Sequence, residues 1–512
     1  MKVRVVTRGG QTEVGRGNCI TLELMNNDQI LKQVMLDCGA GIKIAESFEQ
    51  GPTFAGLELG KLVVLLTHGH RDHISGIPVK LFSYFNQDNL SIYGSHFTLG
   101  MLKLFQKEMT FPQYKFPNGY QRMVNDFYRR NVYLLDTLKS WEYILDQKII
   151  IDDRQWDFMD NQSQLRWAQK WLGVIRETAS KCNWHYMPQP DYIETAFDQY
   201  YSAHNFDLSG HHSIYQPLGW EVVMNGKRFV TLGDIKSLPK NWKIPWSGEA
   251  DVLFLDSTGI EDEGISPGED DFEKVISKLI VDASYSENRR LIIAMFSTNT
   301  PRAEALVEMA FKAGKSISFL GRSMMQTMNL MAQIQGFALG KGRLAKKIST
   351  KWTDVAYGND RADVVITTGC QGEIGSGLWK MTNNRNYYFR PGDILVISAR
   401  MLPGSSEQSL EPMLRQVKKR LGDNIGIIRD QRMIPSPIDN ENCADVVGNY
   451  GPSGHAYKDD LKNIIDIFLR NNPNVIIVPV HGDRDRREKL GHMAQRMGAK
   501  AKLSNDANYF DI

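Results

Sequence analysis

The strongest chemical signal in the sequence is a group of three histidines and one aspartate. His68, His70, Asp72 and His73 occur within six residues, directly after the apolar run LVVLL. Such a group is costly to assemble unless a cation binds it, because protonated histidines repel one another. Neutral imidazole nitrogens and carboxylate oxygens are suitable ligands for zinc or manganese. The segment therefore predicts a metal site at a turn between a strand and a helix.

Other candidate ligands lie in similar places along the chain. Asp37 follows an apolar run in LDCG, Asp234 does so in TLGDIK, and His481 does so in VPVHGD. His204 lies in SAHNFDLSGHH, before the strand pair that leads to Asp234. Taken singly, each could be a turn residue, because Asp and Gly are common in turns. Their shared placement suggests that one edge of a sheet gathers them all.

Two weaker signals stand beside these ligands. His211 and His212 follow His204 and offer spare imidazoles, but we do not expect either to bind metal. The basic residues of the segment 484–489 follow His481 and could contact phosphates. A solvated helix face explains them equally well.

Short apolar runs alternate with helical patterns along most of the chain. The runs that predict strands are 34–39, 61–70, 227–234, 250–258, 289–299, 362–369, 392–399 and 474–483. The stretches that predict helices are 270–284, 302–314, 325–336, 407–421, 456–471 and 485–497. This alternation predicts an α/β protein whose strands are largely buried.

Residues 100–200 differ from the rest because they are rich in aromatic and basic side chains. Half of the ten tryptophans occur here, namely Trp141, Trp156, Trp167, Trp171 and Trp184. We interpret the stretch as a mostly helical insertion in which these aromatics pack together. The alternative is a lid or a stacking surface for single-stranded bases.

Composition sets limits on the class of protein. At 512 residues the chain is long enough for two or three domains, and no apolar run predicts a membrane span. A net charge of +2 means that any nucleic acid must be bound by a local basic channel. The cysteines are odd in number and form no CxxC pair, so we expect neither disulfides nor a cysteine zinc site. The N-terminus lacks the apolar core of a signal peptide, and we expect a cytoplasmic protein.

These motifs together resemble the metallo-β-lactamase superfamily, and within it the β-CASP nucleases of the ribonuclease J group. The segments that carry the resemblance are GGQTEVGRGNCITLEL, VMLDCG, LLTHGHRDHISGIP, LGDIK, LFLDST, MFSTNTPR, GRSM, TTGCQGEIGSGL, GDILVISARMLPG, PSGH and PVHGD. The likeness covers nearly all of the chain except roughly 107–200.

The resemblance implies a domain plan. Residues 1–260 and 441–512 would form one αββα sandwich of the metallo-β-lactamase fold, with the insertion at about 107–200. Residues 261–440 would form the inserted β-CASP domain, itself α/β.

The resemblance also implies a role for each candidate residue. One ion would be held by His68, His70, His204 and Asp234, and a second by Asp72, His73, Asp234 and His481. Asp37 would orient the ligands, and Asp256 would orient His455. His455 would act on the scissile phosphate as a general acid or a transition-state stabiliser, because a histidine outside the metal shell keeps a pKa near neutrality.

The expected activity is hydrolysis of RNA, with single-stranded RNA as the substrate and two divalent ions as cofactors. Zinc is expected, with manganese or magnesium as alternatives. Direct attack by water on phosphorus would leave 5′-phosphate and 3′-hydroxyl ends. The alternatives are a DNA-acting or small-ester hydrolase of the same fold, and an inactive RNA-binding subunit.

The sequence departs from the family at Trp379 and Lys380, where an arginine is common, and at MLPGSS (401–406). Family members bind a 5′ phosphate at both places. We therefore expect endonucleolytic cutting, or exonuclease activity that depends weakly on the 5′ phosphate. The sequence does not define the oligomeric state.

Overall fold

The structure is a computed structural model that describes residues 1–9, 17–40, 52, 54, 56–58, 61–77, 81, 90–110, 183–187, 193–198, 201–334, 348–349, 362–383, 389–400, 405–429, 453–503 and 509–512. The chain packs as two compact units. The first unit comprises residues 1–212, 216–264 and 455–512, and the second comprises 213–215 and 265–454. The family domain boundaries expected at 260 and 440 stay predictions.

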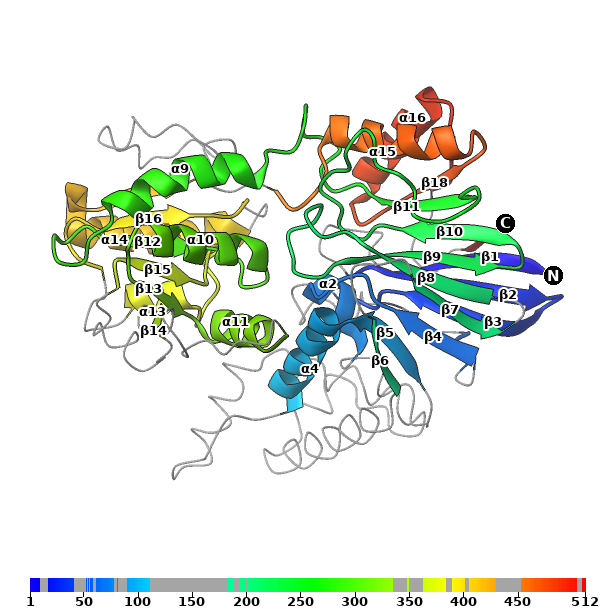
Figure 1. The fold of residues 1–512 in the computed structure, drawn as a ribbon, viewed down its shortest axis with the longest axis horizontal. Helices are drawn as coiled ribbons and strands as arrows, with labels where there is room; N and C mark the ends of the chain where they lie inside the picture. The colour runs from blue at the N-terminus through cyan, green and yellow to red at the C-terminus, as the bar shows by residue number, and fades with distance from the viewer. Residues whose placement is uncertain are drawn as a thin grey trace, which may run out of the picture. The chain divides into compact units, whose positions relative to one another are not determined.

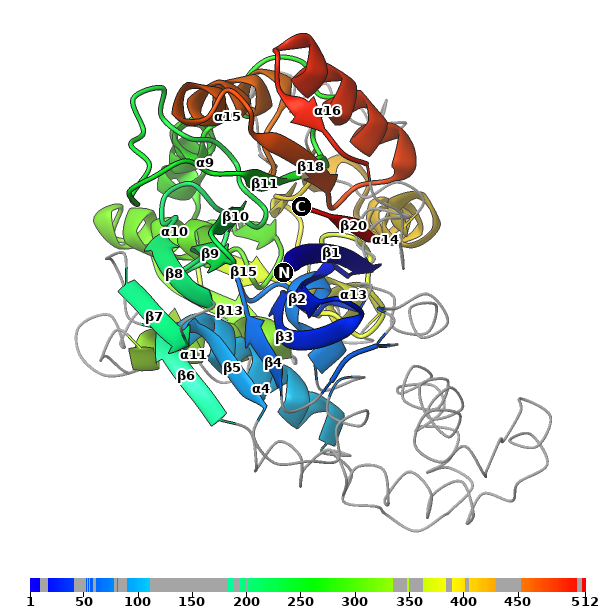
Figure 2. The ribbon, with the colours of Figure 1, turned by 90° about the vertical axis from the view of Figure 1, so that its right-hand side faces the viewer.

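The first unit contains two sheets, each of seven described strands (Figures 1 and 2). The first sheet has the order β20 (Tyr509–Asp511), β1 (Lys2–Gly9), β2 (Cys19–Asn26), β3 (Gln29–Leu36), β4 (Leu62–Leu65), β5 (Ser91–Ser95) and β6 (Asn183–Met187). The second has the order β19 (Lys500–Ala501), β18 (Ile476–Val480), β11 (Val252–Asp256), β10 (Lys227–Thr231), β9 (Leu218–Met224), β8 (Tyr201–Asp207) and β7 (Ile193–Asp198).

The two sheets face each other across an apolar core. Val5 and Leu22 of the first sheet pack in one cluster with Trp220 and Phe254 of the second. The outer face of the second sheet is covered by α15 (Lys458–Asn471) and α16 (Arg484–Arg496), which lie beyond β18 and β11 in Figure 2. Helix α4 (His96–Thr110) packs on β5 and β6 of the first sheet. The first unit is therefore the predicted αββα sandwich.

Strand direction places the candidate ligands at one end of each strand. β10, β11 and β18 pair in parallel, and β3 pairs in parallel with β4. The carboxyl ends of neighbouring parallel strands meet at the same edge of a sheet. Asp234, Asp256 and His481 come at or just after the ends of the first three strands, and His68 comes just after β4.

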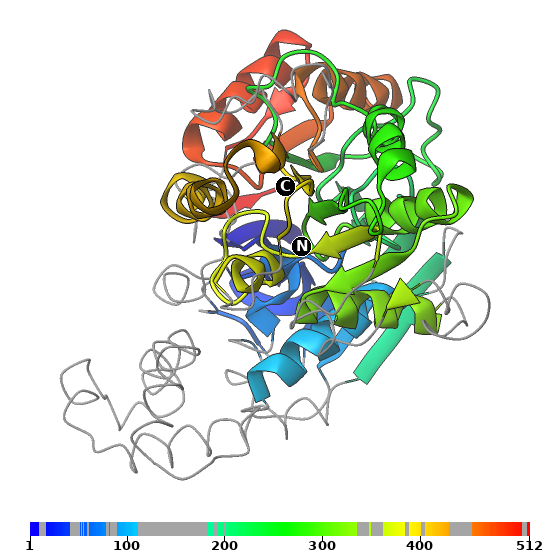
Figure 3. The same cartoon turned by 90° about the vertical axis from the view of Figure 1, so that its left-hand side faces the viewer.

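The second unit is an α/β layer built on a parallel sheet. Its described strands have the order β14 (Ile348–Ser349), β13 (Ile317–Leu320), β15 (Val364–Thr367), β12 (Leu291–Ala294), β16 (Ile394–Ile397) and β17 (Gly426–Arg429). Every pairing between its described strands is parallel. Its helices are α9 (Glu269–Asp282), α10 (Thr300–Lys312), α11 (Arg322–Ile334), α13 (Gly377–Asn383) and α14 (Ser405–Leu421), followed by the 3-10 turn η3 (Gly422–Asn424). Figure 3 shows helices on both sides of these strands, as the alternation of buried strands and helices predicts.

The structure differs from the sequence prediction at the end of the expected insertion. Residues 183–187 and 193–198 are the strands β6 and β7, which lie at the ends of the two sheets. The last part of the range 107–200 is therefore strand rather than helix, because pairing with β5 and β8 decides its conformation. Residues 111–182, which include four of the tryptophans in the predicted insertion, lie outside the described residues. Among the described helices, none is long and apolar enough to cross a membrane.

Candidate metal centre

The histidine-rich segment forms the turn between β4 and the short helix α2 (Arg71–Ile74). The backbone N–H of Leu66 still donates to Tyr93 of β5, at 2.8 Å, so the chain leaves the sheet only after this residue. The Thr67 backbone N–H then donates to Asp37 Oδ1 at 2.7 Å, and its hydroxyl donates to Asp37 Oδ2 at 2.8 Å. The turn is thus fixed by a side chain from the end of the neighbouring strand β3.

His68 and His70 converge on the carboxylate of Asp234. The Nε2 atom of His68 lies 3.0 Å from Nδ1 of His70 and 3.4 Å from Oδ2 of Asp234. Nδ1 of His70 lies 3.7 Å from the same carboxylate oxygen. One ligand atom from each of the three residues lies within 4.8 Å of the others, so the group could hold a metal ion.

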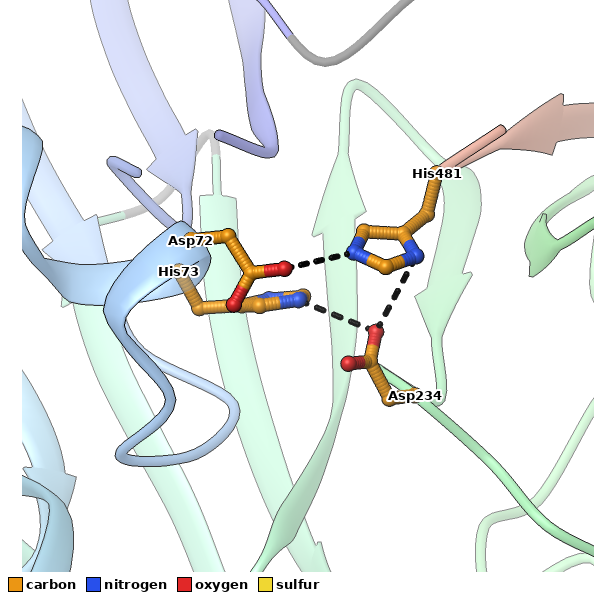
Figure 4. Close-up of side chains that lie close together, drawn as sticks. All are labelled: Asp72, His73, Asp234 and His481. Carbon is orange, nitrogen blue, oxygen red and sulfur yellow. Dashed lines mark hydrogen bonds and ion pairs between the residues drawn. The ribbon is translucent and has the colours of Figure 1, made fainter. Parts of the chain in front are cut away.

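A second group meets the other oxygen of Asp234 (Figure 4). His73 Nε2 lies 2.9 Å from Asp234 Oδ1, and His481 Nδ1 lies 3.7 Å from it. His481 Nε2 lies 3.1 Å from Asp72 Oδ2. Asp234 therefore offers Oδ2 to one group and Oδ1 to the other, which is the arrangement that a carboxylate between two ions requires.

Asp37 contacts His73, a member of the second group, on the side of the ring that faces away from Asp234. Its side chain is fully buried, and His73 Nδ1 donates to its Oδ2 at 2.8 Å. A proton on Nδ1 leaves the lone pair of the neutral ring on Nε2, the nitrogen that faces Asp234. Asp37 thus contacts both Thr67 and His73; its role in orienting metal ligands stays a prediction.

The structure does not bring His204 to the cluster, which differs from the place that the sequence analysis predicts for it. β8 continues three residues beyond His204, to Asp207, so this histidine lies within the sheet rather than at its edge. Its Nδ1 bonds to Glu221, which lies directly opposite on β9 and is itself paired with Arg228. Among the described residues, none of the three candidate metal groups includes His204, and none includes His212.

His212 occupies the place that was expected of His204. It lies five residues past the end of β8, and its ring centroid is 4.3 Å from that of His68 and 5.8 Å from that of His70. Both ring nitrogens are buried and have no hydrogen-bond partner in the described part of the chain. One feature of the sequence could have indicated His212. It lies in the loop that follows a strand, and such loops, rather than the strands themselves, reach the edge of a sheet where ligands gather.

His455 and Asp256 form a pair beside the second group. His455 Nδ1 donates to Asp256 Oδ2 at 2.7 Å, and the His455 ring stacks on His481 with centroids 5.4 Å apart. Asp256 is buried, whereas 24% of the His455 side chain remains exposed. An imidazole held by a carboxylate at one nitrogen is the usual form of a positioned proton donor.

The protonation states of the histidines differ between the group around His68 and the group around His73. Burial, together with the nearby His73, lowers the pKa of His68 well below its ordinary value, and burial also lowers the pKa of His212. Burial alone would lower the pKa of His73, but the charges of Asp234 and Asp37 raise it to about 10. Burial would raise the pKa of Asp72, but the hydrogen bond to His481 and the charge on His73 lower it to about 2. Without ions, protonated histidines therefore balance the carboxylates of the second group.

The donor set fits divalent metal ions. Buried polar atoms are normally hydrogen-bonded, yet Asp234 Oδ1 and both nitrogens of His212 have no hydrogen bond among the described residues. Nitrogen and oxygen ligands of this kind suit zinc and manganese. Cations at the two groups would satisfy these atoms and take over the charge that protonated histidines otherwise provide.

The basic residues after His481 are engaged with acidic neighbours. Arg484 pairs with Glu488 at 2.7 Å, and Arg486 and Lys489 both pair with Glu261. The alternative of a solvated helix face therefore describes them better than phosphate contact does.

Two family models match the chain. Residues 288–416 match the model described as ribonuclease J, beta-CASP domain. Residues 444–504 match the model described as Zn-dependent metallo-hydrolase RNA specificity domain. The second match includes His455 and His481 of the site.

Several curated relatives carry the name ribonuclease J. The protein from Mycobacterium tuberculosis (strain CDC 1551 / Oshkosh) is 28% identical over 324 residues, which are 59% of this chain and 51% of that one. The protein from Corynebacterium glutamicum is 23% identical over 509 residues, or 94% of this chain and 54% of that one. The chain thus spans about half the length of these relatives.

A solved structure shares the fold. It is described as a protein of unknown function from Enterococcus faecalis V583, with a TM-score of 0.55, 12% identity and 100% coverage of both chains. The αββα sandwich, the inserted α/β unit and the matches above define a β-CASP protein of the metallo-β-lactamase superfamily. Within that superfamily, the matched family model over 288–416 and the curated relatives are those of ribonuclease J, to which this chain is similar.

Proposed function

We propose that this protein is a metal-dependent ribonuclease that hydrolyses the phosphodiester bonds of RNA. The observation that carries the proposal is the carboxylate of Asp234, which presents one oxygen to each of two groups of ligand atoms. The names of the relatives and of the two matching family models support RNA as the substrate.

The proposed ligands follow the geometry of the cluster. His68, His70, His212 and Asp234 would hold one ion, and Asp72, His73, Asp234 and His481 would hold the other. His212 replaces the His204 of the sequence prediction. Two divalent ions held by these residues, zinc in our proposal, would supply activated water and positive charge for the phosphoryl oxygens.

The remaining polar residues would position groups and move a proton. Asp37 holds the His73 ring with Nε2 toward the cluster. Asp256 holds Nδ1 of His455, so Nε2 is the atom that would pass a proton to the departing 3′ oxygen. Attack by water needs no 2′ hydroxyl as nucleophile, so the products would carry 5′-phosphate and 3′-hydroxyl ends.

The cleavage mode follows from the family departures. We propose endonucleolytic cutting of single-stranded RNA, or 5′-to-3′ removal of nucleotides that depends weakly on the 5′ group. Trp379 and Lys380 stand in the second unit where an arginine is common in the family. The segment 401–404 of the second departure lies outside the described residues.

The test is a cleavage assay on single-stranded RNA labelled at either end, with DNA of the same sequence as the control. The wild-type protein should cut RNA and leave 5′-phosphate and 3′-hydroxyl ends. His455→Ala should cut about 10²–10⁴-fold more slowly and keep its metal content, because His455 is not among the proposed ligands. Cyclic 2′,3′-phosphate ends would contradict direct attack by water, and cutting of DNA alone would contradict the substrate.

A further inference from the structure

Thr258 lies between the Asp256–His455 pair and the proposed ligand His481. We propose that Thr258 is a positioning residue that selects the Nε2 nitrogen of His481, rather than Nδ1, as the metal-binding atom. This inference rests on the proposed metal site and extends it to a residue that touches no ion.

The hydroxyl of Thr258 is surrounded at hydrogen-bond distance. Its Oγ1 lies 2.6 Å from Asp256 Oδ1, 2.7 Å from the carbonyl oxygen of His481 and 2.9 Å from Nδ1 of the same histidine. All three residues are buried, with relative exposures of 8% for Thr258, 2% for Asp256 and 4% for His481. Water is therefore poorly placed to replace any of these contacts.

The sheet holds these residues in register. β11 and β18 pair in parallel with Asp256 opposite Val480, so the chain beyond Asp256 runs beside the chain that carries His481. The backbone N–H of Ser257 donates to the Val480 carbonyl oxygen at 2.9 Å, which continues the pairing up to Thr258. The hydroxyl and the imidazole thus meet because of strand register and not because of a flexible loop.

Counting protons fixes the direction of the contact with Nδ1. A threonine hydroxyl has one proton to donate and lone pairs that accept. The carbonyl oxygen of His481 only accepts, and Asp256 Oδ1 already accepts from the backbone N–H of Thr258 at 2.8 Å. The single hydroxyl proton therefore goes to one of these two oxygens. The contact at 2.9 Å is favourable only if Nδ1–H of His481 donates to Oγ1.

A proton on Nδ1 has a direct consequence for the metal site. With an ion bound, the neutral ring would then offer its lone pair on Nε2, the atom that is hydrogen-bonded to Asp72 Oδ2 at 3.1 Å in the ion-free structure. In the other tautomer, Nε2–H would donate to Asp72. Neither His481 Nε2 nor that Asp72 oxygen would then be available to bind an ion. In that tautomer the Thr258 hydroxyl would also have to donate its proton to Nδ1. Its Oγ1 would then face Asp256 Oδ1 at 2.6 Å and the His481 carbonyl oxygen at 2.7 Å with no proton between the oxygens, which is repulsive.

Metal affinity tests this role without any RNA. Replacing a residue that orients a metal ligand typically weakens binding about 10–100-fold. Thr258→Val keeps the shape and removes the hydroxyl, so it should weaken zinc binding at one of two sites by that factor. Thr258→Ser, which keeps the hydroxyl, should stay within about threefold of wild type. Ser257→Ala is the matched control, because its hydroxyl donates to the Val480 carbonyl oxygen at 3.0 Å and, among the described residues, to none of the proposed ligands.

The measurements are competition with a chromophoric chelator and elemental analysis of the purified protein. Equal zinc affinity in Thr258→Val and wild type would overturn the proposal, and so would a loss in Ser257→Ala as large as in Thr258→Val. A wild-type protein that binds no zinc would overturn both this role and the metal site. A protein that binds two zinc ions but cuts no RNA would overturn only the proposed function.

A second measurement uses the unaltered chain, so it holds even if Thr258→Val does not fold. Long-range proton–nitrogen spectra of zinc-loaded protein labelled with ¹⁵N-histidine distinguish a protonated from a metal-bound ring nitrogen. The His481 signals, identified by their absence in His481→Gln, should show a protonated Nδ1 and a zinc-bound Nε2. Zinc on Nδ1 would overturn the proposal.

Discussion

Replacing His204 and His212, one at a time, with asparagine distinguishes the ligand set that we propose from the one that the sequence analysis predicts. His212→Asn should remove one ion, whereas His204→Asn should retain both. The reason is distance: the His212 ring lies 4.3 Å from that of His68, while His204 is bonded to Glu221 within the sheet. An asparagine amide at 204 can still donate to Glu221, so the control preserves the local hydrogen bond.

The expected size of the effect follows from the number of ligands. Binding of a structural zinc ion by four ligands is worth about 10–16 kcal/mol, so each ligand contributes about 2.5–4 kcal/mol. Loss of one ligand should therefore weaken binding about 10²–10³-fold, since each 1.4 kcal/mol is about tenfold. His204→Asn should change the affinity by less than about threefold.

The assay is titration of metal-free protein with zinc in competition with a chromophoric chelator, alongside thermal unfolding to check the fold. His212→Asn should bind one ion with wild-type affinity and the other weakly. If His204→Asn lost an ion while His212→Asn kept both, the assignment from geometry would be refuted and the sequence prediction restored.

Three further predictions concern the backbone, the second unit and protons. Gly39→Ala should lower zinc content and RNA cleavage together, because a Cβ atom there would lie 1.6 Å from the carbonyl oxygen of Asp72; unchanged metal content would contradict this. Asp393→Ala should lower the free energy of unfolding by about 3–5 kcal/mol, because it leaves the charge of the fully buried Arg290, its partner at 2.6 Å, without an opposite charge. The urea transition should occur at a lower concentration, and the zinc content should not change. Zinc binding at pH 7–8 should release protons, measured as a dependence of calorimetric heat on the buffer. The cause is the His73 imidazole, whose pKa is lowered by burial but raised overall by two carboxylates to about 10, so it is protonated before the ion binds. Apparent affinity should accordingly rise with pH below 10 by up to about tenfold per unit and per proton, and a flat profile would exclude this state.

From the sequence it was possible to predict that certain candidate ligands gather, namely those that lie close together in the chain or directly after an apolar strand. His68, His70 and His73 share one turn, so their proximity needed no knowledge of the fold. Asp234 and His481 follow strands whose apolar runs are evident, and parallel pairing brings those strand ends to one edge. In each case local spacing and strand direction were enough to indicate a shared site.

The sequence failed where the end of a strand was not visible in it. SAHNFD has no glycine or proline after His204, and cross-strand pairing with β9 extends β8 to Asp207. The pairing places His204 on the sheet and leaves His212 to reach the edge. The strands β6 and β7 were missed for the same reason, since their conformation depends on partners distant in the chain.

Two residues with left-handed backbone conformations contact the second ligand group. Asp37 and His481 have φ angles of 56° and 53°, in the left-handed region that costs an L-residue about 1–2 kcal/mol. Each is held there by its neighbours: the Asp37 carboxylate accepts from Thr67, and the His481 carbonyl accepts from Thr258 at 2.7 Å. A hydrogen bond to a charged group contributes about 1.5–3 kcal/mol, and a neutral one about 1 kcal/mol, so these contacts are of the size needed to offset the strain. The same two strand ends turn sharply enough to aim Asp37 at His73 and His481 at Asp72. Backbone strain and ligand orientation are therefore linked at this sheet edge. Relaxing the backbone of Asp37 or His481 would turn its side chain away from the ligands that it contacts, and the proposed positioning role of Thr258 includes holding the His481 backbone.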